Sequence, residues 1–207
     1  MYAAMLGNEA VGLSFEKRNN EVAQERANVL RIDNVQFVLA DLGDLNSSKH
    51  DLGLFDQIIC TEVIEHVLND KKLISDLSDL LKPRGKLLLT TPFKHYKPLI
   101  GDALSELEDG GHVRWGYTHE EIEKLLNEAG IEVIERSFIG GFMSQQVENV
   151  ARLILKLKIL TLLDPRLRVA VAESVTFPLR VFLIADKWLT NRLRYPFFTI
   201  AVVGRKR

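Results

Sequence analysis

The stretch that decides the fold is Phe55-Asp56-Gln57-Ile58-Ile59-Cys60-Thr61-Glu62-Val63-Ile64-Glu65-His66-Val67. It is a short apolar run that ends in polar residues, and these polar residues are expected to begin a helix. Further along the chain, the same pattern returns in Lys86-Leu87-Leu88-Leu89-Thr90-Thr91-Pro92. Apolar runs without period-two alternation are typical of parallel strands, which are buried on both faces. The two runs therefore predict two parallel strands joined by a helix.

Polar side chains follow the carboxyl ends of both predicted strands. They are Thr61, Glu62, Glu65 and His66 after the first strand, and Thr91 with Pro92 after the second. Ligands of open α/β sheets bind outside the carboxyl ends of the strands. We therefore expect these residues to line one crevice.

The rest of the chain is predicted to alternate between strands and helices. Further strands are expected at 10–15, 35–39, 131–138 and 197–205, and helices at 2–6, 16–31, after an Asn69 N-cap, and after the capping box of Thr118 and Glu121. This order predicts an α/β fold with a doubly wound, mostly parallel sheet. Two domains are expected: residues 1–143 with 194–207 form the sheet domain, and residues 144–193 form a helical insert before the last strand.

The composition is that of a globular protein, with 207 residues, 46% hydrophobic and 27% charged. The single cysteine, Cys60, lies in a predicted buried strand, so disulfides are excluded as part of the fold. No signal peptide is visible, and no apolar run reaches the ~18 residues of a membrane-spanning helix. These features predict a cytoplasmic protein.

The charges are distributed unevenly. Residues 1–150 contain 15 Lys and Arg against 25 Asp and Glu, whereas residues 151–207 contain 12 against 3. The basic, apolar stretches 145–163 and 169–193 have three interpretations: a lid over a substrate, a dimer surface, or a helix pair at a membrane surface. In the membrane interpretation, the headgroups would be contacted by Lys156, Lys158, Arg166, Arg168 and Arg180. An acidic body disfavours a nucleic-acid partner.

Taken together, these segments resemble the class I S-adenosylmethionine-dependent methyltransferases, specifically the broad small-molecule group. The resemblance covers residues 2–138 and the final strand, and rests on 55–67, on 80–92, on His112-Val113-Arg114-Trp115-Gly116-Tyr117-Thr118, and on Val11-Gly12-Leu13-Ser14 with Ala23 and Ala27. It implies a Rossmann-like fold, S-adenosylmethionine as cofactor, and methyl transfer to oxygen or carbon of a small or lipid-like acceptor.

The resemblance also implies which residues contact the cofactor. The family usually has an acid at the end of the 10–15 strand, for the ribose hydroxyls; this chain has Ser14 there and Glu16 two residues on, of which Glu16 is preferred. Asp41 matches the acid that meets the adenine amino group, and Leu42 is its backbone neighbour. Thr61 and Glu62 match residues beside the methionine part.

His66 and His112 are the candidate catalytic bases, because methyl transfer to a hydroxyl needs one. Both histidines also have structural interpretations, His66 against the pocket wall and His112 within an ordered loop. Glu62, Glu65 and His66 would share one helix face, and with His112 they resemble the Glu-x-x-Glu-His arrangement of quinone-pathway and small-RNA O-methyltransferases that can hold a divalent ion. A metal is not favoured, since carboxylates also suit the start of a helix.

One departure from the family stands at the start of the chain. The resemblance implies a first strand and a glycine-rich loop before the 2–6 helix, and residues 1–9 are too few to supply them. We therefore expect a shortened reading frame or a degenerate copy of a longer methyltransferase. The alternative function is a non-catalytic remnant that binds a partner or a membrane. RNA ribose methylation is a third option and would require metal-dependent activity.

Overall fold

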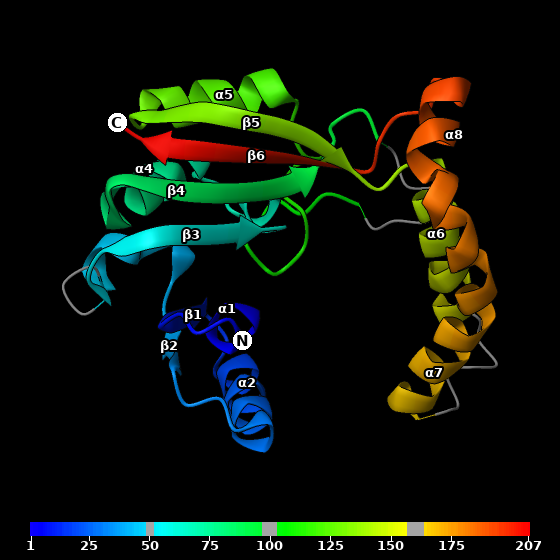
Figure 1. Cartoon of the computed structure of the whole chain (residues 1–207), viewed down its shortest axis with the longest axis horizontal. Coiled ribbons are helices and arrows are strands. Elements are labelled where there is room, and N and C mark those ends of the chain that lie inside the picture. The colour runs from blue at the N-terminus through cyan, green and yellow to red at the C-terminus, as the bar shows by residue number, and fades with distance from the viewer. Residues whose placement is uncertain (49–51, 97–102, 157–163) are drawn as a thin grey trace.

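The computed structural model describes residues 1–48, 52–96, 103–156 and 164–207. Its elements follow the order that the sequence predicts (Figure 1). The first half contains α1 (Tyr2–Met5), β1 (Ala10–Ser14), α2 (Lys17–Leu30), β2 (Val35–Leu39), the 3-10 helix η1 (Leu42–Ser48), β3 (Phe55–Thr61), the 3-10 helix η2 (Ile64–His66), α4 (Asp70–Leu80) and β4 (Leu81–Pro92). The second half contains α5 (His119–Glu128), β5 (Ile131–Ile139), α6 (Phe142–Lys156), α7 (Pro165–Thr176), the 3-10 helix η4 (Phe177–Ala185), α8 (Asp186–Leu193) and β6 (Thr199–Lys206).

Local capping chemistry explains two of the helix starts. The Asn69 side chain accepts a hydrogen bond from the Lys72 N–H at the start of α4. Thr118 and Glu121 form a reciprocal capping box at the start of α5. Both caps are confirmed as predicted.

The main sheet has the strand order β3-β4-β6-β5. β3 pairs with β4 in parallel, whereas β6 runs antiparallel to both β4 and β5. β3, β4 and β5 therefore point the same way, and the sheet is mixed because of β6. This arrangement brings the ends of β3 and β4 to one edge, as the sequence predicts.

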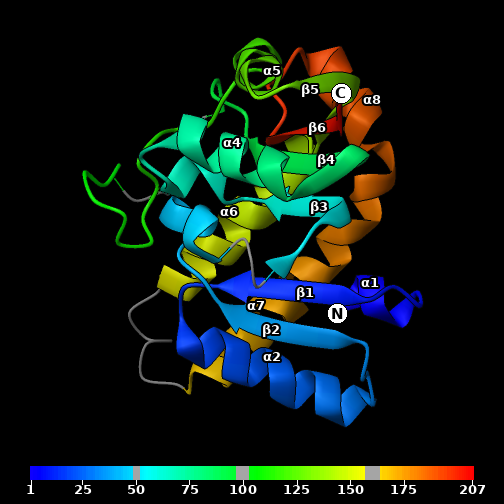
Figure 2. The ribbon, with the colours of Figure 1, turned by 90° about the vertical axis from the view of Figure 1, so that its left-hand side faces the viewer.

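β1 and β2 form a separate parallel sheet of two strands. Figure 2 shows β1 on the side of this small sheet that is nearer to β3. Within the described residues, β1 pairs with β2 and β3 pairs with β4, and no ladder joins β1 to β3. Each of these two strands thus has one edge that no described strand pairs with.

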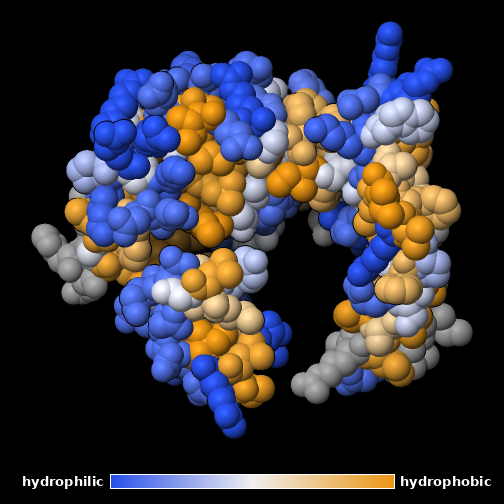
Figure 3. All heavy atoms as spheres, in the orientation of Figure 1, coloured by the Kyte–Doolittle hydropathy of each residue, from blue (hydrophilic) through white to orange (hydrophobic). Residues whose placement is uncertain are grey.

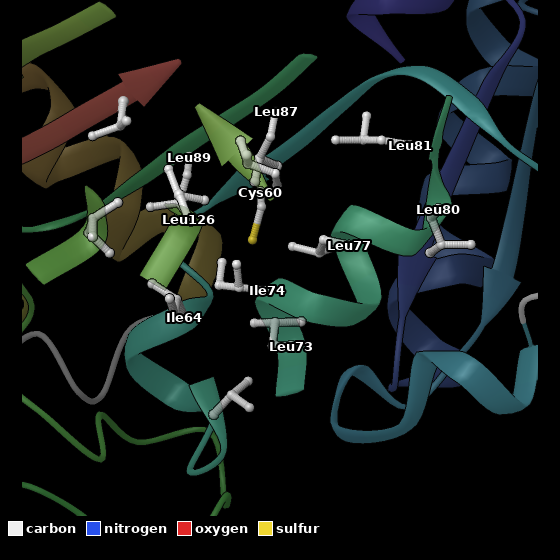
Figure 4. Packing of buried hydrophobic residues seen from close by; sticks show 14 of the residues in the cluster. Cys60, Ile64, Leu73, Ile74, Leu77, Leu80, Leu81, Leu87, Leu89 and Leu126 are labelled. Atoms are coloured by element: carbon white, nitrogen blue, oxygen red, sulfur yellow. The ribbon is translucent and has the colours of Figure 1, made fainter. Parts of the chain in front are cut away.

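The hydrophobic core lies between one face of the main sheet and the helices α4 and α5 (Figure 4). Cys60 from β3, Leu87 and Leu89 from β4, and Leu73 and Leu126 from the two helices are all buried there. Burial raises the pKa of the Cys60 thiol to about 12, so it behaves as a small hydrophobic side chain.

The other face of β3 is less covered than the sequence predicts. Ile59 is 61% exposed, whereas its neighbour Cys60 is 7% exposed. Successive strand residues point to opposite faces, and α4 and α5 pack on the Cys60 face. The prediction that this strand is buried on both faces is therefore wrong for the Ile59 side within the described chain.

Among the described residues between β5 and β6, the helices α6, α7 and α8 with η4 stand beside the sheet as an arm (Figure 1). They lie in the predicted insert, of which residues 157–163, including Lys158, are outside the described residues, as are the side chains of Arg166 and Arg168. None of the described helices is long and apolar enough to cross a bilayer.

A buried carboxylate joins the two ends of this arm. Asp186, at the start of α8, accepts hydrogen bonds from the N–H groups of Gly141, Met143 and Ser144, at 2.8, 2.8 and 3.3 Å. The Ser144 hydroxyl also donates to it. Asp186 therefore caps the start of α6 from a position more than forty residues away.

We expect Asp186→Ala to lower the free energy of unfolding by about 3 kcal/mol, because several buried N–H groups lose their acceptor. Urea titration followed by circular dichroism measures this loss. Glu173→Gln is the control: Glu173 is an exposed acid of the same arm, paired with Arg180, and its removal should cost at most about 1 kcal/mol. Equal losses in the two variants would contradict the capping role.

The same substitution has a defined pH dependence. Burial alone would raise the pKa of Asp186, but the hydrogen bonds from Ser144, Gly141 and Met143 outweigh it and hold the pKa below its ordinary value of 3.8. A lowered folded pKa contributes stability that is present above the unfolded pKa and is lost as pH falls through the folded one. The difference between wild type and Asp186→Ala should therefore be full at pH 7 and shrink below pH 3.8.

Candidate functional site

The residues after β3 do not form the predicted helix. Glu62 has a φ of 52°, in the left-handed region, and its N–H donates to the Thr90 carbonyl at 3.0 Å. A single 3-10 turn, Ile64–His66, follows. The prediction that Glu62, Glu65 and His66 share one helix face is therefore wrong, because the left-handed residue breaks the helix before it begins.

Two threonines of β4 hold the two glutamates. The Thr90 hydroxyl donates to Glu62 Oε1 at 2.9 Å, and the Thr91 hydroxyl donates to Glu65 Oε2 at 3.0 Å. Glu65 is fully buried, and its Oε1 has no hydrogen-bond partner among the described residues. Burial raises the pKa of Glu65 to about 7 and also raises the pKa of Glu62. Glu65 can thus gain or lose a proton near neutral pH.

His66 lies beside the unpartnered oxygen of Glu65. Its Nδ1 is 2.9 Å from the Gly111 carbonyl oxygen, and a carbonyl only accepts, so Nδ1 carries the proton. The other nitrogen, Nε2, is then the basic one in the neutral ring, and it lies 3.9 Å from Glu65 Oε1. His66 Nε2 and Glu65 Oε1 are both acceptors, so a proton or a cation between them would stabilise this arrangement.

The loop before α5 brings His112 to the same place. The Val113 N–H donates to the Glu65 carbonyl at 2.9 Å, and the His66 and His112 rings meet edge to face with centroids 4.6 Å apart. Burial lowers the pKa of His112, and the nearby His66 and Arg152 lower it further. His112 is therefore neutral near pH 7 and able to accept a proton.

Three of the four predicted metal-ligating residues come together. One ligand atom each from Glu65, His66 and His112 lies within 4.8 Å of the others. Glu62 is not part of this group. A carboxylate with two imidazoles suits transition-metal ions such as Mn, Fe or Zn better than Mg or Ca.

The predicted cofactor residues of the first half lie at the ends of β1 and β2. The Ala40 N–H donates to the Ser14 carbonyl at 3.0 Å, which places Asp41 close to Ser14. The Ser14 hydroxyl accepts from the Glu16 N–H, and Asp41 Oδ1 accepts from the Gly43 N–H at 2.8 Å. Glu16 and Asp41 are exposed. The side chain of Leu42 packs against the core.

Glu108 lies in the loop that precedes α5, and it connects Asp41–Gly43 with the turn after β3. The Leu68 N–H donates to Glu108 Oε1 at 2.5 Å. On its other side, a Cβ added at Gly43 would lie 3.8 Å from Glu108 Oε2. The loop thus lies between Asp41–Gly43 and the turn that carries Glu65 and His66. Thr61 is exposed at the end of β3.

The segment that precedes α5 has a structural task besides carrying His112. Arg114 donates to the Asp70 carboxylate, and the Tyr117 hydroxyl donates to the same carboxylate at 2.7 Å. Arg114 also donates to the Leu68 carbonyl at 2.8 Å. These bonds fasten the loop to the start of α4, next to a groove of about 640 Å³ that Arg114 and Tyr117 help to line.

Sequence reasoning missed a second group of polar side chains, on α6 and the start of the loop. Tyr96, Gln145 and Asn149 are each more than nine-tenths buried, and each has a side-chain oxygen without a partner among the described residues. Gln145 Nε2 donates to the Pro196 carbonyl at 2.6 Å, which fixes Oε1 as the free acceptor. The charge of Arg152, on α6, lowers the pKa of His112 and counteracts the burial that raises the pKa of Tyr96.

A signal for this group was available in the sequence. Gln145, Asn149 and Arg152 follow one another at helical spacing, four and three residues apart. Polar residues at such spacing mark one face of a helix. What they face is decided by tertiary structure.

The chain is similar in sequence to known methyltransferases. The model of a family described as "Methyltransferase domain" matches residues 6–136. The ubiquinone biosynthesis O-methyltransferase of Dinoroseobacter shibae is 34% identical over 100 residues, covering 44% of this chain and 40% of that protein. The enzyme of the same name from Mesorhizobium japonicum is 31% identical over 145 residues, covering 65% and 55%. The chain thus spans about half the length of these curated relatives.

Solved structures share the fold. The [4+2]-cyclase SpnF is similar with a TM-score of 0.61 and 18% identity, over 96% of this chain and 67% of that one. A Haemonchus contortus phosphoethanolamine N-methyltransferase 2, solved with S-adenosyl-L-methionine, has a TM-score of 0.59 and 16% identity, over 99% and 44%. These likenesses confirm the Rossmann-like mixed sheet, and the family match covers more than half of the sequence. The chain belongs to the methyltransferase-domain family.

Proposed function

We propose that this chain carries an S-adenosylmethionine-dependent site that methylates a hydroxyl oxygen of a small or lipid-like acceptor. The observation that carries the proposal is the convergence of Glu65, His66 and His112 at the carboxyl ends of β3 and β4. The names of the relatives, O-methyltransferases of ubiquinone biosynthesis, support oxygen as the target atom. Methylation of carbon is the alternative chemistry for the same cofactor.

The chain's own groups suit the steps of such a transfer. S-adenosylmethionine supplies the methyl group when bound. His112 accepts the proton of the acceptor hydroxyl, since it is neutral near pH 7. The Gly111 carbonyl fixes the ring of His66 beside it.

The donor set also suits the cofactor. Glu16 and Asp41 are exposed carboxylates at the ends of β1 and β2, fit to bind hydroxyl and amino groups. Thr61 and the carboxylate of Glu62 lie at the end of β3, where negative charge favours a sulfonium. We assign ribose binding to Glu16 rather than to Ser14, because the Ser14 hydroxyl already accepts the Glu16 N–H.

The two separate sheets affect how well this site can bind. β1 and β3 each have one edge that no described strand pairs with. The open edge of a strand presents a row of unpaired N–H and C=O groups that readily pairs with another strand, so two such edges favour the insertion of a strand. We infer that a further parallel strand fits between β1 and β3 and completes the cofactor site. If no such strand is present, we expect the alternative function, in which the chain is a non-catalytic module of this fold.

Calorimetric titration with S-adenosylhomocysteine tests the proposal. We expect Asp41→Ala to weaken binding about tenfold or more, because a charge-assisted hydrogen bond is lost. Glu25→Ala, at an exposed acid on α2, should bind like the wild type.

A chain extended upstream by about 40 residues, enough for a strand and loop, should bind more tightly than residues 1–207. Absence of binding in both lengths would leave the non-catalytic module as the function.

A metal-dependent version of the same reaction is the second candidate. It is favoured by the unpartnered Glu65 Oε1, which lies 3.9 Å from the basic nitrogen of His66. A divalent ion held by Glu65, His66 and His112 would satisfy this oxygen and activate a hydroxyl as a Lewis acid. His112 would then be a ligand instead of a base.

A further inference from the structure

The segment from Phe177 to Arg194, which comprises η4 and α8, exposes large apolar side chains. Phe177, Val181, Ile184 and Trp188 recur at intervals of four, three and four residues, and their exposed fractions are 69%, 64%, 92% and 68%. Figure 3 shows hydrophobic side chains gathered along this arm. Single exposed apolar residues are normal on a protein surface, but a contiguous group marks an interaction site.

Basic side chains accompany these apolar ones. Residues 165–194 contain six Lys and Arg but only two acids. One acid, Asp186, is buried as the cap of α6, and the other, Glu173, pairs with Arg180. Lys187 and Arg192 are exposed on the same helix as Trp188, one residue before it and four residues after it. The exposed side chains of η4 and α8 are therefore both apolar and positive.

We propose that this face, called here the η4–α8 surface (Phe177, Val181, Ile184 and Trp188 with Lys187 and Arg192), binds the surface of an anionic lipid bilayer. Apolar side chains of an interfacial helix enter the headgroup boundary, while adjacent basic groups meet lipid phosphates. A tryptophan suits this boundary because its ring is apolar and its N–H is polar. A second copy of the chain would present the same positive surface, and like charges disfavour such a pairing.

Vesicle binding tests this surface directly, without reference to catalysis. In a Trp115→Phe background, Trp188 is the only tryptophan, so its emission reports on the surface alone. We expect a blue shift and co-sedimentation with phosphatidylcholine vesicles that contain phosphatidylglycerol, weaker binding to phosphatidylcholine alone, and loss of binding at high salt. Ile184→Asp should weaken binding at least about tenfold.

The matched control is Val29→Asp on α2, since Val29 is also highly exposed, at 82%, but lies outside the surface. It should bind vesicles like the wild type. The double variant Lys187→Gln, Arg192→Gln keeps the apolar group and should lose the preference for phosphatidylglycerol. The proposal is overturned if the wild type ignores both kinds of vesicle, or if Ile184→Asp and Val29→Asp bind equally. If the wild type forms dimers, does not bind vesicles, and becomes monomeric on Ile184→Asp, the surface binds a second copy of the chain instead.

Discussion

Replacing His112 by alanine lowers kcat by about 10²-fold or more, if His112 is the base of the proposed transfer, because general-base catalysis contributes roughly that much. His95→Ala is the matched control, since His95 belongs to the same loop but not to the cluster of Glu65, His66 and His112. The assay follows methyl transfer from S-adenosylmethionine to a small acceptor that carries a hydroxyl group, in the chain length that binds S-adenosylhomocysteine. Equal rates for the two variants would remove His112 from the mechanism.

Two further readouts separate a base from a metal ligand. For a base, the wild-type rate rises with pH through the pKa of His112, which lies below its ordinary value of 6.5, and then levels off. Dialysis against a chelator should leave this rate unchanged. Loss of activity in the chelator, with recovery on addition of Mn²⁺ or Zn²⁺, would assign His112 to a metal centre instead.

Gly116→Ala should cost about 3 kcal/mol or more of unfolding free energy, the second large effect that we expect. Gly116 has a φ of +109°, and a Cβ there would lie 1.9 Å from the Pro92 carbonyl oxygen. That oxygen also accepts the Tyr117 N–H at 3.0 Å, so it cannot move away without losing a hydrogen bond. Backbone strain and a steric clash therefore add.

Gly110 provides the control for the strain alone. Its φ is +93°, but an added Cβ would meet nothing within 4 Å. Gly110→Ala should therefore cost only about 1–2 kcal/mol, the price of the unfavourable backbone conformation. Urea unfolding of both variants separates the two contributions. Losses of similar size would mean that the close approach of Gly116 to Pro92 is not a constraint in solution.

Several features of the fold were predictable because they depend on nearby residues. The strand Val35–Leu39 and the cap at Asn69 have the predicted bounds, and so does the capping box of Thr118. Side-chain periodicity and capping hydrogen bonds act over a few residues, so they can be read from the sequence. The resemblance to the methyltransferases rested on such segments in order, and the family match confirms it.

Other features were not predictable from local pattern. The exposure of Ile59 depends on which face α4 and α5 cover, and the broken helix after β3 depends on the left-handed Glu62. Asp186 lies in the basic C-terminal stretch of the sequence, where nothing local indicates burial. In the structure it is buried and caps a helix that is distant in the sequence. These features depend on burial and on hydrogen bonds between residues far apart in the chain, and neither leaves a repeating pattern in the local sequence.

The order of strands and helices, the family, and the position of Glu65 and His66 after a strand all follow from the amino-acid sequence without the structure. Tertiary packing places His112 against His66, keeps Glu62 out of their group, and buries oxygens of Gln145 and Asn149 that have no partner among the described residues. The reason is physical: a helix or strand forms from the preferences of neighbouring residues, whereas a site forms where packing brings distant residues together.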